Sequence, residues 1–280
     1  MRIAALSSVL AALSLVSCAG TDTAIESAPE PLAISSQAIT YGEGEVTFEG
    51  FIARPAGAVK KRPGVIVVHE WWGHNEYARG RARQLAENGY VALAVDMYGG
   101  GKLAEHPSDA VEFMAEATAD AAVMEARFRA GLALLHAQPD VDTGRTGALG
   151  YCMGGAVCLN MLRAGVELDA VASIHGLLDG AVVADPSVGG SKTIVLAASG
   201  GADPMASEAS VAAFEEEMTA LDLRELRTLV FPGVLHAFSN PDATRLGEEF
   251  ELPLRYDANA DAKSWAATLQ LFRDALGAQD

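Results

Sequence analysis

Gly150-Tyr151-Cys152-Met153-Gly154-Gly155 lies between a short apolar segment, 145–149, and a run of small and apolar residues, 156–164. The first segment predicts a buried strand and the second a helix, so Cys152 is expected at the turn between them. A sharp turn of this kind strains its central residue, and small residues two positions before and after it let strand and helix approach. Gly150 and Gly154 meet that need. The stretch therefore predicts a thiol on a strand-to-helix turn of an α/β fold.

A thiol on such a turn has a chemical use. It faces the positive end of the following helix, which favours the thiolate, and the backbone N–H of Met153 is directed at any oxyanion formed by attack. The pattern is short, however, and by itself it is equally consistent with a core cysteine beside a tight glycine turn. The rest of the chain has to decide between these interpretations.

The first residues predict a bacterial export signal. The apolar run 3–16 is short of the roughly 20 residues that a membrane-spanning helix needs. Leu15-Val16-Ser17-Cys18 resembles the lipobox of bacterial lipoproteins, which implies a signal peptide over residues 1–17 and lipidation of Cys18. Ordinary signal cleavage near the same place is the alternative. We expect an exported protein of the periplasm or cell envelope, attached to a membrane only through this lipid.

Composition limits what the remainder of the chain can be. Residues 18–40, rich in Ala, Ser, Thr and Pro, predict a flexible tether, and residues 41–280 fit one folded domain. A net charge of −17 argues against nucleic-acid binding and against electrostatic docking on anionic lipid. Cys152 and Cys158 are about 9 Å apart along one predicted helix, too far for a disulfide, and the chain has no C-x-x-C pair that would suggest a redox protein.

Strand-like and helix-like segments alternate along the domain. This alternation predicts a single α/β domain with a mostly parallel sheet and helices on both faces. Continuous apolar runs predict buried strands, whereas the alternating segment 45–53 is typical of an edge strand. The predicted buried strands are 64–69, 91–95 and 145–149, and further strands are predicted at 170–174, 193–198 and 226–231. The predicted helices are 77–88, 107–117, 119–137, 156–164, 207–221 and about 260–276.

Four chemically competent side chains follow predicted strands. Glu70, Cys152, Asp203 and His236 should meet at the carboxyl edge of a parallel sheet. The chain order nucleophile, acid, histidine is that of the α/β-hydrolase triad, in which the histidine deprotonates or pairs with the nucleophile and the acid orients the imidazole. Taken singly, Asp203 could be a turn residue and His236 a loop histidine.

The chain resembles the dienelactone hydrolase family over roughly residues 43–275. The resemblance is carried by His69-Glu70-Trp71-Trp72-Gly73-His74-Asn75, Asp96-Met97-Tyr98-Gly99, Gly150-Tyr151-Cys152-Met153-Gly154-Gly155, Asp203 and Gly233-Val234-Leu235-His236-Ala237-Phe238. It implies an α/β-hydrolase fold and cofactor-independent hydrolysis of a lactone or ester through an acyl-thiol intermediate. The implied triad is Cys152, Asp203 and His236.

The resemblance also implies roles around the triad. Glu70 would help to convert the resting thiol into the thiolate when substrate binds, and the backbone N–H groups of Trp71 and Met153 would form the oxyanion hole. Glu70 could instead be a buried partner of Arg79 or Arg81.

We assign the substrate pocket to Trp72, Tyr98, Phe238 and Asn240, although Trp71 and Trp72 could equally pack the core. A zinc site at His69 and His74 is not expected, because these histidines are five residues apart and a glycine interrupts the helical face that such a pair requires. His74 and His175 are expected to be structural or rim residues.

One departure from the family bears on the substrate. Family members that act on dienelactone hold its carboxylate with arginines, one of them four residues beyond the catalytic histidine, where this chain has Asn240. No arginine lies between residues 101 and 126, where another is expected. These features favour a small neutral ester or lactone. The alternative function is a non-catalytic lipoprotein that binds a small apolar ligand in the same cleft.

Overall fold

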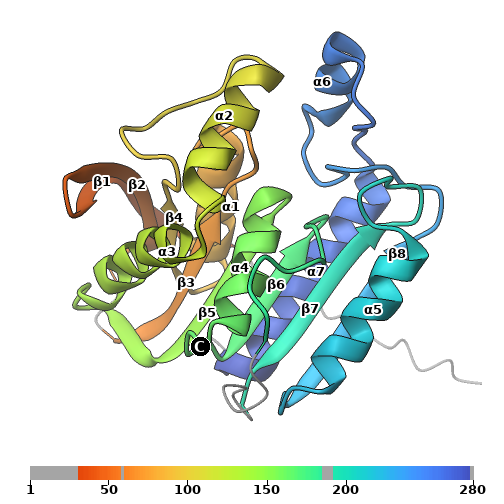
Figure 1. The fold of residues 1–280 in the computed structure, drawn as a ribbon. Coiled ribbons are helices and arrows are strands. Elements are labelled where there is room, and N and C mark those ends of the chain that lie inside the picture. Colours follow the sequence, from red (N-terminus) through yellow and green to blue (C-terminus); the bar gives the residue numbers. More distant parts are fainter. Residues whose placement is uncertain (1–30, 58–59, 185–191, 278–280) are drawn as a thin grey trace, which may run out of the picture. The chain divides into compact units, whose positions relative to one another are not determined.

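One sheet runs through the part of the chain that the structure, a computed structural model, describes: residues 31–57, 60–184 and 192–277. Its strand order is β1-β2-β4-β3-β5-β6-β7-β8 (Figure 1). The strands are β1 (Ile34–Glu43), β2 (Val46–Pro55), β3 (Arg62–Val68), β4 (Val91–Val95), β5 (Val141–Tyr151), β6 (Ala170–Ile174), β7 (Ile194–Gly200) and β8 (Glu225–Phe231). From β4 to β8 all neighbours are parallel, and β1 and β2 add an antiparallel hairpin. The predicted fold class is confirmed.

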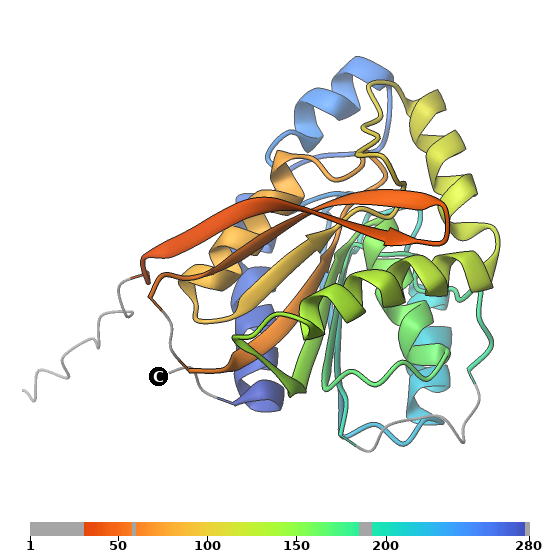
Figure 2. The same cartoon turned by 90° about the vertical axis from the view of Figure 1, so that its left-hand side faces the viewer.

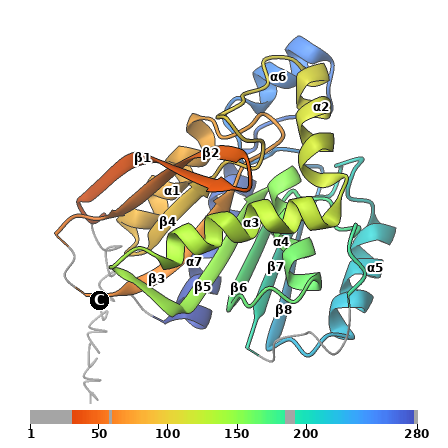
Figure 3. The ribbon, with the colours of Figure 1, turned by 60° about the vertical axis from the view of Figure 1, so that its left-hand side comes forward.

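Helices cover both faces of the sheet. They are α1 (Glu76–Glu87), α2 (Pro107–Thr118), α3 (Ala121–His136), α4 (Met153–Arg163), α5 (Glu208–Thr219), α6 (Ala243–Phe250) and α7 (Ala258–Leu276). One face packs against α3, α4 and α5, and the other packs against α1 and α7 (Figure 3). Strand β3 supplies both cores, because successive side chains point to opposite faces. Val65 and Val67 belong to one core, and Ile66 and Val68 to the other.

The carboxyl edge of the sheet gathers the loops that follow β3, β5, β7 and β8. These strands lie near one another in the strand order, so the side chains that come directly after them meet above the same edge. Helices α2 and α6 stand beyond this edge in both views (Figures 1 and 2). The fold therefore brings α2 and α6 to the same edge of the sheet as these strand ends.

The N-terminal boundary of the domain differs from the prediction. Strand β1 begins at Ile34 and pairs along its whole length with β2, so residues 34–40 belong to the sheet and not to the predicted tether. At this end of the sheet the edge strand is consequently β1, and the segment 46–55 is the second strand; β8 is the edge strand at the other end. Most side chains of β1 are exposed, and its place depends on backbone pairing, which an apolar period cannot reveal.

The prediction missed one helix, and part of it falls on residues that the structure does not describe. Helix α6 was not predicted, because in its eight residues only Ala243 and Gly247 are buried. The predicted signal peptide, Cys18 and the first part of the tether lie outside the described residues. Within the described ranges, no helix is both long enough and apolar enough to cross a membrane.

Candidate active site

Cys152 occupies a strained turn between β5 and α4. Its φ is 53° and its ψ is −116°, a conformation that L-residues rarely adopt. A Cβ atom at Gly150 would collide with the backbone of Gly154, and one at Gly154 would collide with the carbonyl groups of Val68 and His69. Both glycines are therefore required for the close approach of α4 to the sheet. The turn presents the half-buried thiol at the carboxyl edge.

His236 is held by Asp203. The Nδ1 atom of His236 lies 2.7 Å from Oδ2 of Asp203, and both side chains are almost fully buried. A carboxylate can only accept, so Nδ1 carries a proton and donates it to Asp203. This fixes the imidazole with Nε2 directed away from the acid. The geometry is the one that a histidine base and its orienting acid require.

The second ring nitrogen of His236 faces the thiol side of the site. Nε2 is buried, and among the described residues it has no hydrogen-bond partner. Burial alone opposes protonation of His236, but the nearby Cys152 thiolate and the Asp203 carboxylate outweigh burial and raise its pKa to about 10. Cys152 and His236 are thus coupled by charge, without a hydrogen bond of good geometry between them. The arrangement places a histidine of raised pKa beside the thiol.

Two backbone N–H groups are available beside the thiol. Across the described ranges, neither the N–H of Trp71 nor that of Met153 donates to a protein acceptor. The hydroxyl of Tyr98 donates to the carbonyl of Trp71 at 2.7 Å, and it also lies 3.5 Å from the sulfur of Met153. Tyr98 therefore holds the carbonyl of Trp71 and contacts the side chain of Met153. Contrary to its predicted place in the substrate pocket, Tyr98 is not among the residues that line the cavity next to Cys152.

A small apolar cavity of about 130 Å³ opens onto Cys152. It is lined by Glu70, Trp71, Trp72, Met114, Cys152, Met153, Leu177, Met205, His236, Ala237 and Leu254. None of these described lining residues is Lys or Arg, so the cavity suits an uncharged group. Trp72 lines it as predicted. Phe238 does not, because it is buried between Phe231 and His175 in the core below.

Asn240 acts on the cavity indirectly. Its amide Nδ2 donates to Oε2 of Glu70 at 2.6 Å, and its side chain borders a separate pocket of about 370 Å³ between α1 and α6. Trp72 borders both spaces. Asn240 is therefore a partner of Glu70 rather than a wall of the inner cavity.

Glu70 is a buried carboxyl group at the cavity wall. Burial raises its pKa to about 7, against the opposing effects of the Asn240 hydrogen bond and of the positive charges of His236 and Arg81. Arg81 donates to Asp261 and to the carbonyl of Ser239. It does not form the ion pair with Glu70 that the sequence left open as an alternative. Glu70 changes its charge close to neutral pH.

We expect the free energy of unfolding of Glu70→Gln, relative to that of the wild type, to increase as the pH rises from 4.5 to about 7. Below this range the carboxyl is protonated in both the folded and the unfolded chain. Within it the unfolded chain ionises while the folded one stays protonated, so the wild type loses up to about 3 kcal/mol, a loss that is complete above pH 7. Urea unfolding at pH 4, 6 and 8 measures the difference, with exposed Glu249→Gln as the control. A difference that does not change with pH would contradict the raised pKa.

His69 and His74, the two histidines of the segment 69–75, have structural roles. Nε2 of His69 accepts the N–H of Met97 at 3.1 Å, and Nδ1 contacts the carbonyl of Glu70. His74 is buried, and burial with the neighbouring His69 and Arg79 lowers its pKa to about 3. In the described part of the chain, no three side chains of the metal-ligating types gather as a metal site.

Sequence reasoning gave no specific role to His175 and overlooked Ser239. His175 follows β6 at the same sheet edge as Cys152, and its Nδ1 accepts the N–H of Cys152 at 3.2 Å. Ser239 lies three residues beyond His236 and contacts His175 at 2.7 Å. Their positions after a central strand and beside the catalytic loop were the available signals.

Comparison with known proteins places this site in context. The model of the dienelactone hydrolase family matches residues 48–276. A dienelactone hydrolase-like promiscuous phosphotriesterase from metagenomic libraries is 31% identical, with a TM-score of 0.77 over 88% of this chain and 100% of that chain. A dienelactone hydrolase from Anabaena variabilis is 20% identical, with a TM-score of 0.57 over 87% and 99%, and shows the fold alone. Protein usf of Aquifex pyrophilus is 32% identical over 50% of this chain and 62% of its own length.

Proposed function

The chain belongs to the dienelactone hydrolase family and is a hydrolase of esters or lactones; from that premise we propose that it needs no cofactor and uses Cys152 as a nucleophile. The observation that carries this proposal is the strained turn that presents Cys152 to the His236–Asp203 pair across one apolar cavity. A merely structural thiol would not require a backbone conformation of this kind.

The reaction divides into two halves. In the first, the Cys152 thiolate attacks the carbonyl carbon, the bond to the leaving oxygen breaks, and Nε2 of His236 gives its proton to the departing alcohol. In the second, Nε2 takes a proton from water, and the hydroxide attacks the thioester and releases the acid and the thiolate. Asp203 orients the imidazole throughout. The N–H groups of Trp71 and Met153 stabilise the oxyanion in both halves.

The substrate that the cavity favours is neutral and small. Apart from the catalytic His236, the cavity walls carry no basic side chain, and the position four residues after His236 is Asn240, whose amide is already bonded to Glu70. A substrate carboxylate would find no Lys or Arg among these walls and would lie beside the Glu70 carboxyl group, so a charged lactone is disfavoured. We therefore assign the substrate class to uncharged carboxylic esters or lactones.

Rapid mixing with a chromogenic ester should leave an acyl group on Cys152 and none on Cys158. Thioesters form readily from thiolates, whereas burial raises the pKa of Cys158 and shields it. Glu70→Gln should slow formation of the adduct more than its hydrolysis, because its proposed role is to help generate the thiolate. Intact-mass analysis and peptide mapping locate the label. An acyl group on Cys158, or turnover with no adduct on Cys152, would contradict thiol catalysis, and absence of both turnover and adduct would favour the ligand-binding lipoprotein.

We also propose that the protein is an exported bacterial lipoprotein anchored through Cys18. The support is the Leu15-Val16-Ser17-Cys18 sequence after a short apolar run. Cys18→Ser should move the protein from the membrane fraction to the soluble fraction, because the lipid is the proposed attachment. Fractionation followed by immunoblotting measures this, with Cys158→Ala as the matched cysteine control. A Cys18→Ser protein that still sediments with membranes would refute the anchor.

A further inference from the structure

A buried histidine binds the backbone of the nucleophile itself. The N–H of Cys152 lies 3.0 Å from the carbonyl of Ile174 and 3.2 Å from Nδ1 of His175. A backbone N–H can only donate, so Nδ1 of His175 is unprotonated and the ring proton sits on Nε2. Nε2 therefore donates to Oγ of Ser239, at 2.7 Å. Two hydrogen bonds thus lead from Cys152 to Ser239.

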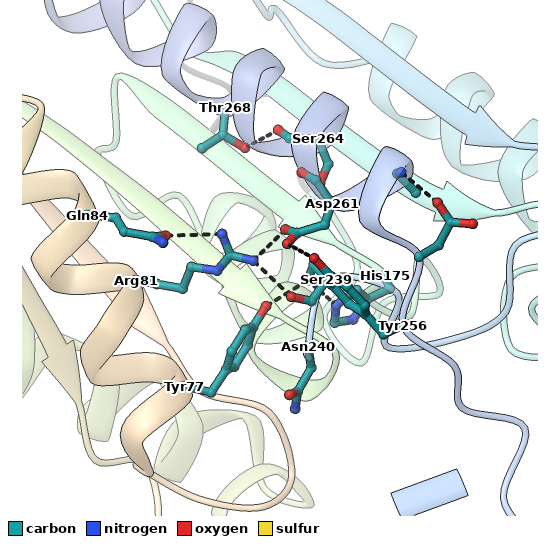
Figure 4. Close-up of polar contacts among 12 residues, drawn as sticks. Tyr77, Arg81, Gln84, His175, Ser239, Asn240, Tyr256, Asp261, Ser264 and Thr268 are labelled. Carbon is teal, nitrogen blue, oxygen red and sulfur yellow. Dashed lines mark hydrogen bonds and ion pairs between the residues drawn. The ribbon is translucent and has the colours of Figure 1, made fainter. Parts of the chain in front are cut away.

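Ser239 is in turn tied to two helices (Figure 4). Its hydroxyl lies 2.6 Å from that of Tyr77 on α1, and its carbonyl accepts from Nη2 of Arg81 at 2.9 Å. The same Nη2 binds Oδ1 of Asp261 on α7 at 2.5 Å, and Tyr256 donates to the other oxygen of that carboxylate. Ser239 is thus fixed against α1 and α7, and with it the loop that carries His236.

His175 keeps its acceptor role while charge develops beside it. The rings of His175 and His236 meet edge to face with centroids 5.2 Å apart, and Arg81 lies over the rings of Tyr77 and Tyr151 on the other side. Burial, followed by the charges of His236 and Arg81, lowers the pKa of His175 well below its ordinary value. His175 is therefore neutral when His236 is an imidazolium, and the bond to Cys152 persists.

We propose that His175 and Ser239 are positioning residues that set the spacing between the Cys152 turn and the His236 loop. The inference rests on the proposed function, in which these two loops carry the nucleophile and its base. The need for such a bridge follows from the site: Cys152 acts on His236 at close range, but Nε2 of His236 has no partner with full hydrogen-bond geometry among the described residues, so direct contact alone does not fix the spacing of the two reacting groups. Their spacing depends on the backbones that carry them.

The test compares Ser239→Ala, His175→Asn and the double variant with Thr268→Val. Asn tolerates the left-handed backbone of His175, with φ 43°, and can still accept from Cys152, but its side chain is too short to reach Ser239. Thr268→Val is the matched control, because it also removes a buried hydroxyl, one that donates to the carbonyl of Ser264 on α7 (Figure 4).

We expect Ser239→Ala and His175→Asn each to lower kcat about tenfold to a hundredfold with little change in KM, and the double variant to lose no more than either alone. The rate at which iodoacetamide alkylates Cys152 at a fixed pH should fall in both, because the imidazole of His236 is no longer held beside the thiol. Thr268→Val should lose thermal stability without either change.

Each other result would overturn the proposal. A Ser239→Ala protein with the kcat and alkylation profile of Thr268→Val would show a purely structural role, as would a change in KM alone. Losses that multiply in the double variant would show two independent effects. If His175→Asn does not fold, the comparison of Ser239→Ala with Thr268→Val decides alone. A Cys152→Ala variant that remains active would instead refute the proposed function and the bridge together.

Discussion

Cys152→Ala should lower kcat/KM for a chromogenic ester by at least about ten-thousandfold, because the members of a catalytic triad act as a unit. The residual rate would come only from binding in the cavity and from the two N–H donors. The side chain is half-buried and small, so the variant should fold and melt close to the wild type. Steady-state kinetics beside a thermal melt measure both quantities.

The matched control for this variant is Cys158→Ala. Cys158 lies six residues further on, buried among the apolar side chains of α4, and it should be dispensable for turnover. A Cys152→Ala protein that keeps more than about a tenth of the activity would have lost less than about 1.4 kcal/mol of transition-state stabilisation, which excludes a nucleophile.

His236→Ala should lose about as much activity as Cys152→Ala, and the double variant should be no worse than either. Without the imidazolium, the thiolate loses the charge that stabilises it, and the leaving alcohol loses its proton donor. We expect kcat to fall, rather than KM to rise. Iodoacetamide should also alkylate Cys152 more slowly at a fixed pH.

His106→Asn provides the control for removal of a histidine. His106 is exposed and caps α2, and asparagine is itself a good capping residue, so activity and stability should both be retained. Additive losses in the His236→Ala and Cys152→Ala double variant would argue that His236 works independently of the thiol.

The central strands and the positions of four key residues could be predicted because each rests on a local signal. Continuous apolar runs mark strands that are buried on both faces, and Glu70, Cys152 and Asp203 follow such runs within a few residues. His236 follows β8, a partly exposed edge strand whose apolar residues still marked it in the sequence. The glycines around Cys152 have no other explanation than close packing. These local patterns can be interpreted without any knowledge of the neighbouring helices and strands.

The pocket could not be predicted in the same way, because side-chain direction depends on the loop backbone. Ala237 has a positive φ of 56°, and after this turn Phe238 points into the core while Ala237 itself faces the cavity. Nothing in Ala-Phe reveals that reversal. The hydroxyl of Tyr98 likewise reaches a carbonyl 27 positions earlier in the chain, a contact that only the folded structure defines.

The exposed edge strand has a practical consequence for anyone who prepares this protein. A gene that starts at residue 41, where the sequence alone would set the domain boundary, deletes most of β1 and leaves Ile52 and its neighbours on β2 paired only with β4 on the other side. The uncovered backbone would then offer a template for pairing between molecules and for precipitation. Expression trials should therefore begin no later than Pro31, so that the whole of β1 is translated.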